Sequence, residues 1–273
     1  MTQSPLDPVL DELWERRADL SPADEDARKI VIAAVDQLDA GEARVAQVVD
    51  DEVVVDERAK RAILLRFKVL DMVEGSNGGF YVHDRVPLKP SFPGVRVVAG
   101  AIARWGSHFE PGVVLMPSYT NIGGYVGSGS MVDTWATVGS CAQVGRDVHL
   151  AGGVGIGGVL EPPQATPTII EDGAFIGSRC VVVEGVVVEE EAVLGAGVVL
   201  TASTQVVDVS GPEPVVSRGR IPARSVVIPG SRPKEFPAGT FHVPCALIVG
   251  QRQESTDRKT SLNDVLRTFD VQV

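Results

Sequence analysis

The sequence predicts a mainly β protein built around a parallel β-helix, because an aliphatic residue returns every six positions along the middle of the chain. A six-residue period matches neither an α-helix nor an alternating strand, and it is typical of coils made of three short strands. A second row, two positions earlier in each hexad, holds no residue larger than valine, as a narrow core requires. The first row consists of Val126, Val132, Val138, Val144, Leu150, Ile156, Ile170, Ile176, Val182, Val188, Leu194, Leu200, Val206, Ile221 and Val227.

Glycine often follows the inward residue, and we interpret these glycines as corners where the backbone leaves its usual regions. They are Gly127, Gly139, Gly145, Gly157, Gly177 and Gly195. The six-step register also extends backwards through Ile102 and Val114, but His108 and Thr120 occupy it too. We therefore expect the first coil to be less regular than the others.

The predicted organisation has three parts: an N-terminal α/β domain (1–95), the β-helix (96–233) and a C-terminal strand and helix (234–273). In the first part, Ser21 and Pro22 resemble the N-cap and first residue of a helix that ends near Gly41. The other elements expected there are a helix within 5–20, two short strands within 44–55, a helix over 57–67 and a proline-rich linker over 87–94.

Two excursions interrupt or follow the coils. The prolines of 161–167 cannot donate to a strand ladder, so that segment is predicted to be a loop, and 207–219 is a second excursion. Residues 241–250 alternate and are apolar, which indicates a strand. We expect a mobile polar segment over 251–260, followed by a helix capped by Ser261.

Composition narrows the class of function. The net charge of −11 argues against nucleic acid or an anionic membrane as a partner. No apolar run approaches the roughly 20 residues that span a bilayer. Three cysteines, with no signal-peptide pattern at the N-terminus, favour the cytoplasm. The four histidines and the cysteines lack metal-ligand spacing, so we expect no metal.

Asp133 stands in the slot that glycine fills in several other coils. It could be a turn residue that bonds a nearby backbone N–H, which aspartate does well, or it could be functional. Trp135, two residues later, could cover an outer face or line a ligand cleft beside this acid.

Two further stretches could hold a ligand. Gly152–Gly158 lies inside the hexad register and not between a strand and a helix, so it is not a dinucleotide-binding loop. Its side-chain-free backbone at Gly153 and Gly155 could nevertheless lie against a long, thin ligand. A basic cluster near the end of the array is either solvated surface or a seat for an anion. It contains Arg218, Arg220, Arg224, Arg232 and Lys234.

Long segments identify a family. LMPSYTNIGGYV (115–126), the 42-residue stretch that begins MVDTW (131–172) and GRIPARSVV (219–227) closely resemble 2,3,4,5-tetrahydropyridine-2,6-dicarboxylate N-succinyltransferases. ERRADLSP (15–22), GEARVAQ (41–47) and LNDVLRTFD (262–270) are similar too, so the resemblance spans nearly the whole chain. It implies a left-handed β-helix, a homotrimer, and active sites in clefts between neighbouring coils.

The resemblance also implies residue roles. Asp133 matches the family's substrate-site aspartate, and Arg96 in PGVRVV matches its arginine for a substrate carboxylate. Many members carry a carboxylate where this chain has Val181, and Glu184 lies nearby as an alternative. Trp135 and Glu184 join the expected substrate-binding set. The expected CoA contacts are Gly153, Gly155, Arg218, Arg220, Arg232 and Lys234.

The implied reaction transfers a succinyl group from succinyl-CoA to the amine of L-2-amino-6-oxopimelate, in the diaminopimelate–lysine pathway. We expect direct attack on the thioester, because no serine or cysteine has an evident activating base. Asp133 would orient the substrate ammonium and accept or relay its proton as a general base, and a pKa raised by desolvation in the closed cleft would make it a better one.

Two alternatives remain open. One is another hexapeptide-repeat acyltransferase, with an acetyl-CoA donor or a sugar acceptor. A sugar acyltransferase would be expected to place a histidine in the cleft, and His149 is the candidate. The other is a β-helix that only binds and does not catalyse.

Overall fold

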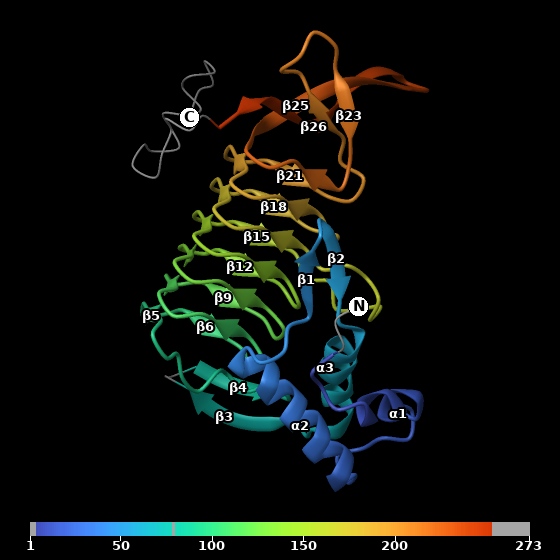
Figure 1. Ribbon diagram of the computed structural model, residues 1–273, viewed down its shortest axis with the longest axis vertical. Helices are drawn as coiled ribbons and strands as arrows, with labels where there is room; N and C mark the ends of the chain where they lie inside the picture. The colour runs from blue at the N-terminus through green and yellow to red at the C-terminus, as the bar shows by residue number, and fades with distance from the viewer. Residues whose placement is uncertain (1–3, 78–79, 253–273) are drawn as a thin grey trace.

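The computed structural model describes residues 4–77 and 80–252. Its centre is a left-handed parallel β-helix, in which two-residue strands stack into three flat faces (Figure 1). Face I contains β6 (Ile102–Ala103), β9 (Tyr119–Thr120), β12 (Thr137–Val138), β15 (Gly155–Ile156), β18 (Val181–Val182) and β21 (Val199–Leu200). Face II contains β7 (His108–Phe109), β10 (Tyr125–Val126), β13 (Gln143–Val144), β16 (Ile169–Ile170), β19 (Val187–Val188) and β24 (Arg220–Ile221).

Face III is the longest, because it continues beyond the coils. Its coil strands are β5 (Arg96–Val97), β8 (Val114–Leu115), β11 (Met131–Val132), β14 (His149–Leu150), β17 (Phe175–Ile176) and β20 (Val193–Leu194). An antiparallel ribbon of β25 (Ser225–Phe236) and β26 (Gly239–Gln251) then extends it, followed by β22 (Val206–Asp208) and β23 (Val215–Ser217). The strand predicted over 241–250 is therefore confirmed as β26, whereas its partner β25 was missed.

The predicted inward row is confirmed, since none of its residues is more than 2% exposed. The small second row is buried with it, including Ala136, Ala142 and Cys180. Branched side chains alternate with small ones because three strands leave little room around the axis of the coil.

The register of the first coil differs from the prediction. Ala103, Phe109 and Leu115 point inward, and Ile102, His108 and Val114 point outward. The cause is one short step: Thr120, which pairs with Val138 and is buried, follows Leu115 after five positions. A one-residue shift moves every earlier side chain to the other side of its strand.

The corner glycines have a different reason from the predicted one. None of them has a positive φ. The left-handed residue comes three positions after the inward residue, as at Gly129, Trp135 and Gly153. Gly127 and Gly139 are instead required by close stacking: a Cβ would lie 2.6 Å from Gly145 in the first case and 2.2 Å from Gly158 in the second.

The N-terminal part packs on the corner between faces I and II. It contains α1 (Val9–Glu15), α2 (Glu25–Ala40), β1 (Ala46–Val49), β2 (Glu52–Val55), α3 (Glu57–Val69), β3 (Val73–Asn77) and β4 (Phe80–Asp84). Its apolar core reaches Ile122 and Cys141 of the coils, and the β1–β2 hairpin covers Ile169 and Val187 of face II. The strands of face I, labelled β9 to β21 in Figure 1, face the viewer beside the β1–β2 hairpin.

Capping places α2 later than predicted. Asp24, not Ser21, caps this helix, because its carboxylate accepts the Ala27 amide at 3.0 Å. The Ser21 hydroxyl accepts the Ala23 amide instead, in a turn before the helix. The β3–β4 hairpin was not predicted, because Gly75, Ser76 and Asn77 give β3 no alternating apolar pattern.

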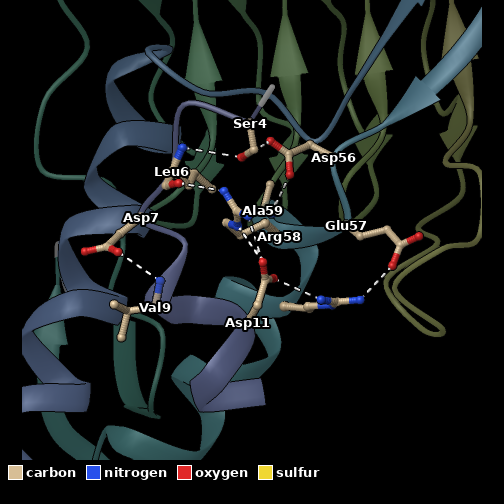
Figure 2. A network of polar contacts seen from close by, with 10 residues as sticks. Ser4, Leu6, Asp7, Val9, Asp11, Asp56, Glu57, Arg58 and Ala59 are labelled. Carbon is tan, nitrogen blue, oxygen red and sulfur yellow. Dashed lines mark hydrogen bonds and ion pairs between the residues drawn. The ribbon is translucent and has the colours of Figure 1, made fainter. Parts of the chain in front are cut away.

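A polar network fastens the first residues to α3 (Figure 2). Asp11 accepts hydrogen bonds from Arg58 at 2.7 Å and from Arg61 at 2.9 Å. Asp56 caps α3 through the Ala59 amide and also accepts the Ser4 hydroxyl at 2.6 Å. These contacts orient α1 against α3.

Two further findings concern the predicted C-terminal helix and the possibility of a membrane-spanning helix. The helix predicted after Ser261, and all but the first two residues of the polar segment before it, lie outside the described residues. None of the helices that the structure describes is long and apolar enough to cross a membrane.

Candidate functional site

The corner between β11 and β12 carries Asp133, which directly follows the inward Val132. The Asp133 Oδ1 accepts the Thr134 amide at 2.6 Å and the Thr134 hydroxyl at 3.2 Å. The turn-residue interpretation of Asp133 is therefore correct as far as Oδ1 is concerned. The second oxygen, Oδ2, is left for another partner, and the side chain stays 31% exposed.

That partner is His149 on the next coil. Met131 and His149 are paired in the parallel ladder of face III, so the imidazole stands one strand above the end of β11. The His149 Nε2 lies 3.6 Å from the Asp133 Oδ2. Nε2 is shielded from solvent and has no hydrogen-bond partner among the described residues. The ring packs on Phe175 of β17, with 5.0 Å between the ring centroids.

The electrostatics of Asp133 differ from the expectation. Burial raises the pKa of this carboxyl, but the hydrogen bonds from Thr134 and the contact with His149 outweigh burial and hold the pKa below its usual value. In the single chain, therefore, Asp133 lacks the upward pKa shift that desolvation in a closed cleft would produce. Asp133 is a firmly ionised carboxylate that can hold a cation better than it can accept a proton.

Arg96 and Trp135 lie near this corner. Arg96 is exposed on β5, which is separated from β11 by one strand, β8, on the same face. Trp135 occupies the left-handed position of the corner, with φ of 61°, and its side chain is 72% exposed. An arginine, an acid and an open indole thus share one edge of the coil stack.

Glu184 does not join this group. It lies at the corner between faces I and II, and its Oε2 accepts the Ala202 amide at 3.1 Å. Val181 points outward on face I, beside Gly155. Within one chain, therefore, neither the substitute acid nor the position of the missing acid is brought to Asp133.

The glycine backbone lies one coil above Trp135. Gly153 has a φ of 71°, and the Arg179 side chain crosses it so closely that a Cβ would lie 2.7 Å from the Arg179 Cδ. Gly155 is outward on face I between Thr137 and Val181. Arg179, which the sequence did not single out, places a cation beside the glycine stretch.

The basic cluster is divided. Arg220 lies on face II, where it pairs with Glu189 at 2.7 Å and donates to the Asp51 carbonyl at 3.1 Å. Arg218 is exposed just before it, and Arg232 and Lys234 lie on β25. These residues do not converge with Gly153 and Gly155 in a single chain.

The described residues give little support for a metal site or a cysteine nucleophile. Within 4–77 and 80–252, no group of three or more His, Cys, Asp or Glu side chains is placed to hold a metal ion. All three cysteines are buried, and burial raises the pKa of Cys141 to about 12 and that of Cys180 to about 11. Such thiols are poor nucleophiles.

A cavity of about 630 Å³ lies away from Asp133, between the β1–β2 hairpin and face II. Its lining contains two ion pairs, Arg146 with Asp172 and Arg220 with Glu189. The corner at Asp133 remains the better candidate, because its acid has an oxygen free of hydrogen bonds.

The triangular coils with a hexapeptide period, taken with the family matches that follow, place the protein in the class of hexapeptide-repeat acyltransferases. Comparison with known families agrees: residues 5–69 match the N-terminal domain of tetrahydrodipicolinate N-succinyltransferase, and residues 167–202 match the hexapeptide repeat of succinyltransferases.

Relatives are similar over nearly their whole length. The 2,3,4,5-tetrahydropyridine-2,6-dicarboxylate N-succinyltransferase of Acinetobacter baylyi is 48% identical, with 97% of this chain and 99% of the relative covered. That of Polynucleobacter asymbioticus is 49% identical, with 98% and 100% covered. The chain belongs to the 2,3,4,5-tetrahydropyridine-2,6-dicarboxylate N-succinyltransferase family.

A solved structure supports the fold. A Campylobacter jejuni protein described as a 2,3,4,5-tetrahydropyridine-2-carboxylate N-succinyltransferase aligns with a TM-score of 0.51 at 15% identity. The alignment covers 81% of this chain and 62% of that one. At this identity the likeness concerns the fold alone.

Proposed function

We propose that the protein transfers the succinyl group of succinyl-CoA to the amine of L-2-amino-6-oxopimelate, the ring-opened form of tetrahydrodipicolinate, in the diaminopimelate–lysine pathway. The observation that carries this proposal is the 48% identity over 97% of the chain to a relative named for tetrahydropyridine-dicarboxylate succinylation. The free thiols also fit a reducing, cytoplasmic location.

The reaction proceeds by direct attack. The amine nitrogen forms a bond to the thioester carbonyl carbon, the carbon–sulfur bond breaks, and CoA leaves. A covalent acyl-enzyme on cysteine is disfavoured, because Cys141, Cys180 and Cys245 are buried with raised pKa values.

In this proposal Asp133 is a catalytic residue whose negative charge attracts the substrate ammonium to this corner of the coil. An ionised carboxylate with a lowered pKa suits that task. Arg96, one strand beyond β8 on the same face, pairs with a substrate carboxylate, a group that a planar guanidinium binds well. The Trp135 side chain lines the edge of the cleft.

The CoA thioester lies along the glycine backbone at Gly153 and Gly155, where the nearby Arg179 adds a positive charge. Arg218, Arg220, Arg232 and Lys234 are too dispersed in one chain to complete that site. Glu184 and Asp133 are also far apart within one chain, because they lie on different corners of the coils. A second subunit would bring such groups together.

We therefore propose a homotrimer in which face I packs against a neighbouring subunit. The outward residues of face I are uncharged throughout, and exposed apolar surface of this kind marks subunit contacts. They are Ile102, Tyr119, Thr137, Gly155, Val181 and Val199. Faces II and III, by contrast, are partly covered by the β1–β2 hairpin and by residues of the β25–β26 ribbon.

Release of free thiol from acyl-CoA tests the function. Purified protein is assayed with succinyl-CoA or acetyl-CoA, each with and without L-2-aminopimelate as a stable acceptor. Release that requires both succinyl-CoA and the amine supports the proposal. A preference for acetyl-CoA would contradict succinyl-CoA as the donor. Absence of thiol release with both donors would contradict the proposed activity.

A further inference from the structure

We propose that His149 is the base that accepts the proton of the attacking amine, and that Asp133 holds its imidazole ring in the productive orientation. This inference rests on the proposed function, because that reaction needs a proton acceptor beside the amine. It goes beyond that function because it assigns the role of proton acceptor to His149. It also assigns a joint role to His149 and Asp133, which lie on neighbouring coils.

The ladder of face III creates the pair. Met131 and His149 are direct partners in the pairing of β11 with β14, so the imidazole stands next to the corner that follows β11. Thr134 fixes Oδ1 of Asp133 with two hydrogen bonds, which leaves Oδ2 directed at the His149 Nε2 at 3.6 Å. Among the described residues, Asp133 is the one carboxylate within 4.0 Å of a nitrogen of this imidazole.

This contact selects a tautomer. Nε2 is shielded from solvent and has no hydrogen-bond partner in the described part of the chain, so a proton on Nε2 is best placed when it points at the Asp133 carboxylate. A carboxylate beside a histidine fixes tautomer and ring orientation in this way in hydrolytic triads. The lone pair then lies on Nδ1, which makes no hydrogen bond to a described residue.

Packing keeps the ring in place. Met131 and Phe175 flank His149 in the ladder, and the Phe175 ring lies 5.0 Å away at an interplanar angle of 56°. Neither neighbour is titratable. The His149 side chain is nevertheless 40% exposed, so its free edge can meet a substrate. A base that is both oriented and accessible is what a proton transfer requires.

Asp133 alone is poorly suited to accept the proton. The substrate is an alkyl ammonium with a pKa of about 10, taking lysine as a guide. Thr134 and His149 hold the Asp133 pKa below its usual value in spite of burial, which makes this carboxylate a weak base. Imidazoles as a class change charge near neutral pH, where a general base is most effective.

The protons and bonds balance without any further reactant. The bound ammonium first loses one proton to solvent. As the neutral amine forms its bond to the thioester carbon, His149 accepts a second proton from nitrogen. The carbon–sulfur bond breaks, and His149 returns that proton to the sulfur of CoA. Each turnover yields one amide, one CoA thiol and one proton, and it leaves His149 neutral.

The test compares His149 with His108, a histidine in a similar structural setting. His108 is outward on face II and stacks on Tyr125 with 5.2 Å between the ring centroids. We expect His149→Ala to lower kcat by about 10²- to 10⁴-fold with little change in either KM, and His108→Ala to keep kcat near the wild-type value. Added imidazole should restore turnover to His149→Ala in proportion to its concentration.

A second variant and a pH profile complete the experiment. His149→Gln should be as slow as His149→Ala, and both should lose the acidic limb of the kcat/KM profile. Near-wild-type kcat in both variants would overturn the role of His149. So would loss of activity that imidazole does not restore and that accompanies a lower Tm. Wild-type protein without thiol release would instead overturn the proposed function itself, so the two failures are distinguishable.

Discussion

Gly139 and Gly158 face each other on successive coils, so closely that a Cβ on Gly139 would lie 2.2 Å from the Gly158 backbone nitrogen. Such a Cβ cannot be accommodated unless the coils separate. We predict that Gly139→Ala lowers the free energy of unfolding by about 1–3 kcal/mol, the usual cost of overpacking. Gly152→Ala is the matched control, because its Cβ would meet only the Thr134 carbonyl at 3.6 Å. Denaturant unfolding of both variants measures the difference, and equal stabilities would contradict the close-stacking explanation.

Asp133→Asn should keep the fold and lower turnover by roughly 10²-fold or more. Asparagine can still accept the Thr134 amide, but it removes the negative charge that faces His149. Asp147→Asn, at another corner of the coil, is expected to retain activity. Thiol release with succinyl-CoA and L-2-aminopimelate measures both variants. Wild-type kinetics in Asp133→Asn would refute a catalytic role for this residue.

Arg96→Ala should raise the KM for the amino substrate by at least tenfold and leave the KM for succinyl-CoA nearly unchanged. The reason is the loss of a charge-assisted pair with a substrate carboxylate. Steady-state kinetics with each substrate varied in turn provides the measurement. If only the KM for succinyl-CoA rises, Arg96 belongs to the CoA site and our assignment is wrong.

Val199→Arg should turn the proposed trimer into a monomer. Val199 is 49% exposed on face I in the single chain, and a buried charge at an apolar interface is unfavourable. Light scattering coupled to gel filtration gives the mass, and Arg218→Ala, on an exposed segment, serves as control. A trimer that persists in Val199→Arg would exclude this part of face I from the interface.

The stability provided by Asp11 should depend on pH. Hydrogen bonding from Arg58 lowers the Asp11 pKa, and Arg61 adds to the effect, although burial opposes it. A carboxyl whose pKa is lowered by folding stabilises the protein above its unfolded pKa of 3.8 and loses that effect as pH falls through the folded value. Asp11→Asn should therefore cost about 1 kcal/mol at pH 7 for two partly exposed ion pairs.

The Tm difference between wild type and Asp11→Asn should shrink as pH falls below 3.8 and should disappear only below the lowered folded pKa, where Asp11 is protonated in both the folded and the unfolded state. Asp26→Asn removes an exposed pair with Lys29 and should change Tm little at any pH. A Tm difference for Asp11→Asn that stays constant from pH 7 to pH 3 would contradict the ion-pair explanation.

The inward residues of the coils were predictable because their pattern is local. Each six-residue repeat contains its own aliphatic residue at the inward position. The first coil was not predictable, because Ile102 and Val114 are followed by apolar Ala103 and Leu115, so that two registers fit the sequence equally well. The five-residue step that decides between them becomes visible only through the pairing of Thr120 with Val138.

Predictions about the site succeeded or failed for related reasons. The place of Asp133 in the corner follows from counting hexads. Its contact with His149 could have been found by adding one coil of 18 positions to Met131, a step that the paired strands make explicit. The role of the glycines and the direction of the Asp133 pKa shift depend on distances between coils, which no local pattern encodes. The dispersed arginines and Glu184 require a second chain.

The pairing of each strand with the next strand on its face has a mechanical consequence. Most ladder contacts of the coils join segments only 17 or 18 residues apart, as with Val126 and Phe109 or Val132 and Leu150, and the two excursions lengthen the others to 26 or 33 residues. The stack therefore resembles a row of coupled units, in which stability is a sum of neighbour-to-neighbour terms. Unfolding that begins at one end of the stack should therefore proceed coil by coil, while the amides of distant coils keep their protection from hydrogen exchange. The corner at Asp133 lies well inside the row, where fraying from either end arrives last.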